Sequence, residues 1–118
     1  MKNLRIIVPC IAVLLFGCST PNQMREKTPD MEVTSSKPAQ KVAACIANRW
    51  ENLGVMGSTI PVNMKPTEDG YSVSWYNTTW EKTNIIADVK ENKSGSVTRF
   101  YRAISMTERF EKAIKECQ

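Results

Sequence analysis

An apolar run at the N-terminus constrains this chain most, because it decides which residues are left to fold. The run covers residues 6–16, about 11 residues, and follows Lys2 and Arg5. It is shorter than the roughly 20 residues that a membrane-spanning helix needs. A short apolar core behind basic residues is typical of a secretory signal. We therefore expect residues 1–17 to be removed on export, so that only the rest folds.

The end of this run, Leu15-Phe16-Gly17-Cys18, resembles the lipobox of bacterial lipoproteins. The resemblance implies signal cleavage between Gly17 and Cys18, followed by attachment of acyl chains such as palmitate to Cys18. In that family an Asp after the modified Cys retains the protein in the inner membrane. Ser19 stands there instead, which implies a lipid anchor in the outer membrane, facing the periplasm. An ordinary signal cut elsewhere, with Cys18 as a spare thiol, is the alternative.

The rest of the chain is also similar to a group of small, mostly uncharacterised lipoproteins of Gram-negative bacteria and their prophages. The likeness spans residues 45–118. It consists of a helix from Cys45 to Trp50, strands around Gly70–Val73 and Ala87–Val89, and a helical Cys117 near the end. It implies no active residues.

Lipoprotein processing would leave two of the four cysteines, Cys45 and Cys117, in a compartment that permits disulfides. A bridge between them closes a loop of 72 residues, for which the chain-entropy model gives roughly 4 kcal/mol of stabilisation. The alternative is a pair of metal-binding thiols. That would need further ligands, and the chain has no His. We therefore predict a disulfide.

The expected mature chain is almost neutral. Loss of Lys2 and Arg5 leaves 14 of the 16 basic side chains against 12 acidic ones, a net charge of about +2. No basic cluster indicates a nucleic-acid partner. Residues 18–37 are rich in Ser, Thr, Pro and charge, which predicts a flexible tether. Its ends would lie about 25 Å apart on average, and roughly 60 Å apart when stretched.

Residues 38–118 suit one small α+β domain. Apolar residues recur at helical spacing over 38–53 and 105–116, and Ser105 and Glu108 fit a capping box for the second helix. Turn signals such as Asp69-Gly70 separate four β-like runs. These strands are expected over 58–65, 71–76, 84–90 and 96–104. In the second strand Tyr71, Val73 and Trp75 would share one face, with Ser72, Ser74 and Tyr76 on the other. The prediction is a four-stranded antiparallel meander with both helices on one side, joined by the disulfide.

Catalytic chemistry is mostly absent from the sequence. Without His, the Ser-His and Cys-His arrangements of nucleophilic catalysis are excluded. A carboxylate pair drawn from Asp69, Glu81 and Asp88 would suit glycan hydrolysis only if two acids face each other in a cleft. The strand pattern places Asp88 on a solvated position. We expect no enzymatic activity, no cofactor and no metal site.

Trp80 is the aromatic residue that periodicity cannot place in a core, so it is the first candidate for a binding hot spot. The leading hypothesis is a lipid-anchored, non-catalytic envelope lipoprotein. It would contact the bilayer through the acyl chains on Cys18 and bind an unidentified envelope protein or glycan. The alternatives are an inhibitor or exclusion factor against a lysozyme, phage or plasmid entry, and a carboxylate-dependent cell-wall hydrolase.

Overall fold

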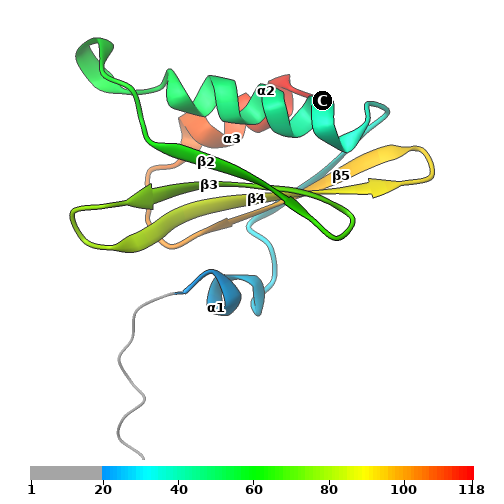
Figure 1. Cartoon of the computed structure of the whole chain (residues 1–118), viewed down its shortest axis with the longest axis horizontal. Helices are drawn as coiled ribbons and strands as arrows, with labels where there is room; N and C mark the ends of the chain where they lie inside the picture. Colours follow the sequence, from blue (N-terminus) through cyan, green and yellow to red (C-terminus); the bar gives the residue numbers. More distant parts are fainter. Residues whose placement is uncertain (1–19) are drawn as a thin grey trace, which may run out of the picture.

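A computed structural model describes residues 20–118, which form an α+β domain built on a five-stranded antiparallel sheet. The expected signal peptide and Cys18 lie outside the described residues. The strand order is β1-β5-β4-β3-β2, so β2 to β5 form a meander and β1 is added beside β5. Figure 1 shows α2 and α3 on one face of the sheet and α1 on the other. In chain order the elements are α1 (Pro21–Arg25), β1 (Met31–Ser35), α2 (Ala39–Glu51), the 3-10 turn η2 (Val55–Gly57), β2 (Val62–Thr67), β3 (Gly70–Asn77), β4 (Lys82–Asn92), β5 (Gly95–Arg102) and α3 (Glu108–Glu116).

The main core lies between the sheet and the pair α2 and α3. Trp50 of α2 is fully buried at its centre. Its ring meets Phe100 of β5 and Phe110 of α3 edge to face, with centroids 6.1 and 5.8 Å apart, and its Nε1–H donates to the Phe110 carbonyl at 3.1 Å. The sheet contributes alternate side chains, as its period of two requires. They include Val73, Ile85, Ala87, Val89 and Phe100.

The predicted four-stranded meander is present as β2 to β5 but is not the whole sheet, because a fifth strand lies in the expected tether of residues 18–37. β1 pairs with β5 from Met31 opposite Phe100 to Ser35 opposite Ser96. Met31 and Val33 pack against the main core, whereas Glu32 between them is exposed. This is the alternation of a strand with one buried face. It is only five residues long and needs β5 as its partner, so the pattern alone did not reveal it.

A short helix also lies in the expected tether. Thr20 and Gln23 form a capping box for α1, with Pro21 in the first turn, where its missing N–H costs nothing. Met24 is buried against Ile86 and Tyr101, in a small second core on the face opposite α2. Two parts of the expected tether, α1 and β1, are therefore folded onto the sheet.

The start of the last helix also differs from its prediction. α3 begins at Glu108 rather than Ser105, because Met106 takes a left-handed backbone conformation with φ of 61°. Thr107 stands at the N-cap without a side-chain cap, and its hydroxyl donates to the Glu111 carboxylate at 2.7 Å. The predicted capping box of Ser105 and Glu108 does not form.

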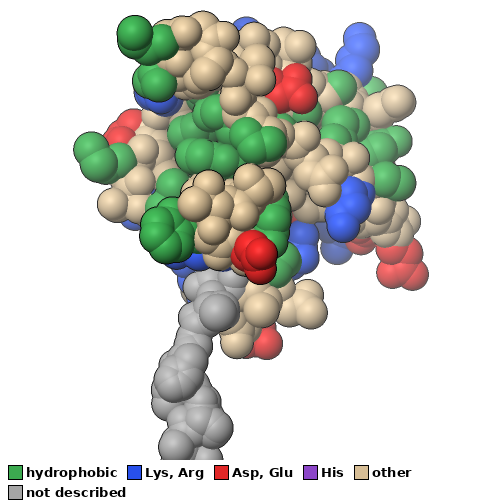
Figure 2. Space-filling view, turned by 60° about the vertical axis from the view of Figure 1, so that its left-hand side comes forward, with side chains coloured by type: hydrophobic (Ala, Val, Ile, Leu, Met, Phe, Trp, Pro, Cys, Tyr) green, Lys and Arg blue, Asp and Glu red, His purple; other side chains and the backbone are tan. Residues whose placement is uncertain are grey.

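One end of the sheet collects three loops. Here Val62 at the start of β2 lies opposite Trp75, Trp75 opposite Ile85, and Ile85 opposite Arg102 near the end of β5. The α2–β2 connection, the β3–β4 loop and the β5–α3 connection therefore emerge side by side at what we call the loop end. Figure 2 views the molecule from this side. The β2–β3 and β4–β5 turns lie at the opposite end.

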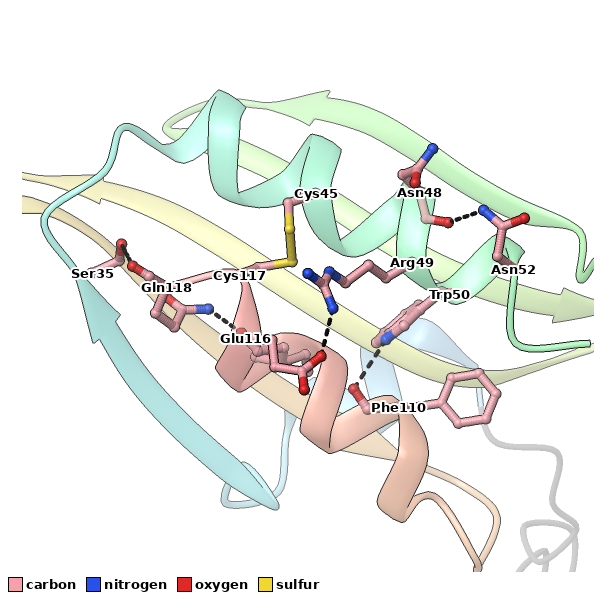
Figure 3. The surroundings of a disulfide bond; sticks show 11 residues. Ser35, Cys45, Asn48, Arg49, Trp50, Asn52, Phe110, Glu116, Cys117 and Gln118 are labelled. Atoms are coloured by element: carbon pink, nitrogen blue, oxygen red, sulfur yellow. Dashed lines mark hydrogen bonds and ion pairs between the residues drawn. A yellow bond between two sulfur atoms is a disulfide. The ribbon is translucent and has the colours of Figure 1, made fainter.

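The predicted disulfide between Cys45 and Cys117 is present (Figure 3). It joins α2 to the end of α3 across 72 residues of chain. Beside it, the guanidinium of Arg49 pairs with the carboxylate of Glu116. As predicted, the bridge ties both helices to the same side of the sheet.

Candidate functional site

Trp80 lies in the β3–β4 loop, residues 78–81. The side-chain oxygen of Asn77 accepts hydrogen bonds from the backbone N–H groups of Thr79 and Trp80, at 3.0 and 3.1 Å, so an Asx turn shapes the loop. The indole is 72% exposed. Trp80 is therefore outside the core, as the sequence indicated. Its role in binding stays a prediction.

The other two connections at the loop end also present large apolar side chains. Met56 is 96% exposed and Met106 83% exposed, and Val55 is exposed beside Met56. Figure 2 shows hydrophobic side chains at several places on this side of the molecule. Single exposed apolar residues are ordinary, so the position of several at one end of a small domain makes this end a candidate interaction surface. We call Val55, Met56, Trp80 and Met106 the apolar loop cluster.

Each of the three loops holds a residue in the left-handed backbone region. The φ angles are 56° at Met56, 50° at Glu81 and 61° at Met106, the positive values found outside glycine in residues 20–118. This conformation costs an L-residue roughly 1–2 kcal/mol. Met56 and Met106 are themselves exposed, and the turn over Met56 is closed by the N–H and Oγ of Ser58, which donate to the Val55 carbonyl at 3.1 and 2.7 Å. Such positions concentrate at functional surfaces.

On the opposite face of the sheet, which we call the α1 face, an ion pair holds α1 in place. Arg25 donates from Nε and Nη2 to the two carboxylate oxygens of Asp88, at 2.6 and 2.9 Å, and from Nη2 to the Ser72 hydroxyl at 3.0 Å. This bidentate pair raises the pKa of Arg25, with the Asp88 hydrogen bonds as the main cause. The predicted solvated position of Asp88 is correct only in part, because its side chain is 27% exposed but Arg25 of α1 lies over it.

Tyr101 of β5 lies next to this pair and is buried under Met24. Burial raises the pKa of the Tyr101 phenol, and the negative charge of Asp88 adds to the effect. Both causes disfavour the phenolate. Tyr101 is therefore a neutral side chain at physiological pH, and it forms part of the surface on which α1 packs.

A hollow of about 420 Å³ opens on the α1 face between α1 and strands β2 to β4. Its size lies within the range of small-ligand sites. Its polar lining consists of hydroxyl, amide and cationic groups, and no Asp or Glu side chain belongs to the lining. The complete lining is Pro21, Arg25, Asn63, Lys65, Pro66, Thr67, Ser72, Ser74, Tyr76, Thr83 and Ile86. Arg25 and Lys65 can only donate hydrogen bonds, whereas the hydroxyl and amide groups both donate and accept, so the hollow suits a polar ligand whose acceptors face the two cations.

The three candidate acids do not form a common site. Asp69 and Glu81 adjoin opposite ends of β3, which spans roughly 23 Å at about 3.3 Å per residue, so they cannot flank one glycosidic bond. Asp69 and Asp88 line one hollow of about 310 Å³. Each is held by a cation there, Asp69 by Lys90 at 3.4 Å and Asp88 by Arg25 at 2.6 Å.

Sequence reasoning missed Arg25 and Lys65 as site residues. Arg25 lay in the expected tether, where no periodicity marked it. Ser72, Ser74 and Tyr76 were correctly assigned to one face of a strand, opposite the core face. The sequence does show the hydroxyl residues that alternate on this face of β3. It does not show that α1 folds back over the face and forms one side of the hollow.

Within residues 20–118, no three His, Cys, Asp or Glu side chains gather in a way that could hold a metal ion. Among the same residues, no helix is long and apolar enough to cross a membrane. The predicted cleavage and lipidation positions, Gly17 and Cys18, lie outside the described residues. No family model matches this chain, and comparisons with curated proteins and with solved structures give no match either.

Proposed function

We propose that the chain is a lipid-anchored, non-catalytic envelope lipoprotein that binds another component of the envelope. The anchor is the acylated Cys18, and the address is the outer membrane, facing the periplasm. The lipobox-like Leu15-Phe16-Gly17-Cys18 supports the anchor, and the Cys45–Cys117 disulfide is consistent with an oxidising compartment.

The hollow on the α1 face is the observation that carries the binding role. It is open, and eight of its lining side chains can donate a hydrogen bond: Arg25, Asn63, Lys65, Thr67, Ser72, Ser74, Tyr76 and Thr83. The Arg25–Asp88 pair and the burial of Met24 hold its α1 wall against the sheet. A preformed wall lowers the ordering cost of binding.

The chemistry of the hollow favours a polar partner whose acceptors face its two cations. Lys65 on the edge strand β2 adds a positive charge, while the charge of Arg25 is largely offset by Asp88. Glycan hydroxyls and the carboxylates of an acidic protein segment both fit donors of this kind. We therefore infer an envelope glycan or protein as the ligand.

Site-specific photocrosslinking in Gram-negative cells tests the binding role with the full-length protein. A photoreactive amino acid replaces Lys65, which lines the hollow, or Lys41, an exposed lysine on α2 at the opposite face of the sheet. We expect a saturable crosslinked product from position 65 and none from position 41. Equal, non-saturable crosslinking from both positions would contradict the proposal. A captured hydrolase that loses activity in the product would favour the inhibitor alternative.

The anchor has a separate test. Cys18→Ala should abolish incorporation of a radioactive fatty acid and leave either an uncut precursor or a soluble periplasmic form. The disulfide-bonded domain should survive, because Cys45 and Cys117 are untouched. Label that persists in the Cys18→Ala protein would show that the lipobox interpretation is wrong.

A further inference from the structure

The described chain begins on the α1 face of the sheet, at the hollow between α1 and strands β2 to β4. Pro21, the first residue of α1, lines the same hollow as Tyr76 and Thr83. Tyr76 stands near the end of β3 and Thr83 near the start of β4, and these two strands lead into the loop that carries Trp80. The same hollow extends to Pro66 and Thr67 at the opposite end of β2, so its lining places the start of α1 alongside β2 to β4 on the α1 face.

The proposed anchor, Cys18, is separated from the folded domain by very few residues. Thr20 is already the N-cap of α1, with its side chain and backbone bonded to Gln23. An acyl chain on Cys18 would lie two residues before it, a reach of about 7 Å for extended chain. The tether predicted from sequence allowed roughly 60 Å when stretched. A domain held this closely stays next to the bilayer, so its exposed apolar side chains are within reach of lipid.

We propose that the loop end docks on the lipid bilayer, with Trp80, Met56 and Met106 entering the interfacial region. This inference rests on the proposed Cys18 anchor. Trp favours the membrane interface, because its indole combines a large apolar surface with one hydrogen-bond donor. The Met56 and Met106 side chains are almost fully exposed, and the interface supplies an apolar environment for them.

The position of the anchor favours a bilayer over a protein as the occupant. A protein partner would need these loops accessible, whereas an anchor two residues before α1 keeps the domain next to lipid. The charges flanking Trp80 are one acid, Glu81, and one base, Lys82. Docking should therefore depend on apolar contact and change little with salt or with anionic lipid content.

Tryptophan fluorescence in vesicles tests this arrangement. The purified full-length protein is reconstituted in phosphatidylcholine vesicles whose acyl chains carry bromine, a contact quencher, or do not. Trp50 is fully buried and Trp75 is partly buried under α3, so Trp80 is the tryptophan most accessible to lipid. We expect bromination to reduce the emission of the wild type, and the Trp80→Phe protein to lose most of that reduction.

A matched control moves the tryptophan to the far end of the sheet. Glu68 is exposed in the β2–β3 turn, so the double variant Trp80→Phe with Glu68→Trp should be no more quenched than Trp80→Phe alone. Mass spectrometry of the same samples reports whether Cys18 is acylated. Acylated protein whose Trp80 is not quenched would overturn the docking proposal while leaving the anchor intact. Protein from a lipoprotein-processing host that carries no lipid on Cys18 would overturn both proposals.

Discussion

The solvent exposure of several side chains in this domain is set by an element that packs over them from elsewhere in the chain. Asp88 and Tyr101 follow the strand alternation that normally gives a solvated face, yet Met24 and Arg25 of α1 cover both. Glycine shows the same dependence on context at Gly70. A Cβ there would lie 1.9 Å from the Val89 carbonyl oxygen, so close approach of β4 demands glycine although its φ is not positive.

The raised pKa of Tyr101 predicts an alkaline effect on stability. Burial and Asp88 raise the phenol pKa in the folded state above its unfolded value of about 10. The corresponding stabilisation is complete below pH about 10 and is lost as pH rises through the folded pKa. Tyr101→Phe should change the free energy of unfolding by about 1 kcal/mol or less at pH 8. It should also lose less stability than the wild type between pH 8 and pH 11.

Urea unfolding of both proteins at several pH values measures this difference. Other titrating groups are common to the two proteins, so the difference between their curves isolates Tyr101. Parallel curves up to pH 11 would refute the assigned burial of the phenol.

At the scale of elements, α1 is the piece least supported by its own sequence. Five residues are too few for a helix to be stable alone. Its position depends on Met24 in the small second core, on the Arg25–Asp88 pair and on the capping box at Thr20. Both the hollow and the proposed membrane orientation depend on α1 staying docked.

Met24→Ala should therefore release α1 while leaving the main core intact. A buried Met→Ala change costs about 2–5 kcal/mol when the site cannot relax, and we expect the lower end here because a short terminal helix can detach. Hydrogen exchange followed by mass spectrometry should show faster exchange in residues 20–25 and little change in α2. Met106→Ala, at an 83% exposed position, is the control and should alter neither. Unchanged protection of residues 20–25 in Met24→Ala would count against this role of Met24.

At the scale of the whole molecule, the disulfide compensates for a small core. The two helices of the main core, α2 and α3, are far apart in sequence but pack on the same face of the sheet. Trp50 of α2 contacts both Phe100 and Phe110 there. Domains of this size bury comparatively little surface, so a covalent link between distant elements supplies a large share of the stability.

Loss of the bridge should lower the free energy of unfolding by about 4 kcal/mol, the chain-entropy value for a 72-residue loop. The measurement compares denaturant unfolding of wild type with and without reductant, and of the double variant Cys45→Ala with Cys117→Ala. Reduced wild type and the double variant should unfold at similar midpoints, both below that of the oxidised protein. A wild-type midpoint that ignores reductant would show that the bridge contributes little.

The sequence by itself determined the elements whose periodicity is long enough to read. Trp50 and its neighbours predicted α2, and the alternation of Tyr71, Val73 and Trp75 predicted the core face of β3. Cys45 and Cys117 predicted the bridge. Each of these patterns reports burial within one element, and helical or strand periodicity carries that information directly.

Only the tertiary structure decided the fate of residues 20–35 and the geometry of both candidate surfaces. α1 and β1 have five residues each, which is too short for either to be stable alone. α1 is stabilised when Met24 packs against Ile86 and Tyr101. β1 is stabilised when it pairs with the edge of β5. The gathering of Met56, Trp80 and Met106 at one end follows from strand register, which joins residues far apart in sequence. Local periodicity contains no information on such contacts, because the partner that provides the free energy lies elsewhere in the chain.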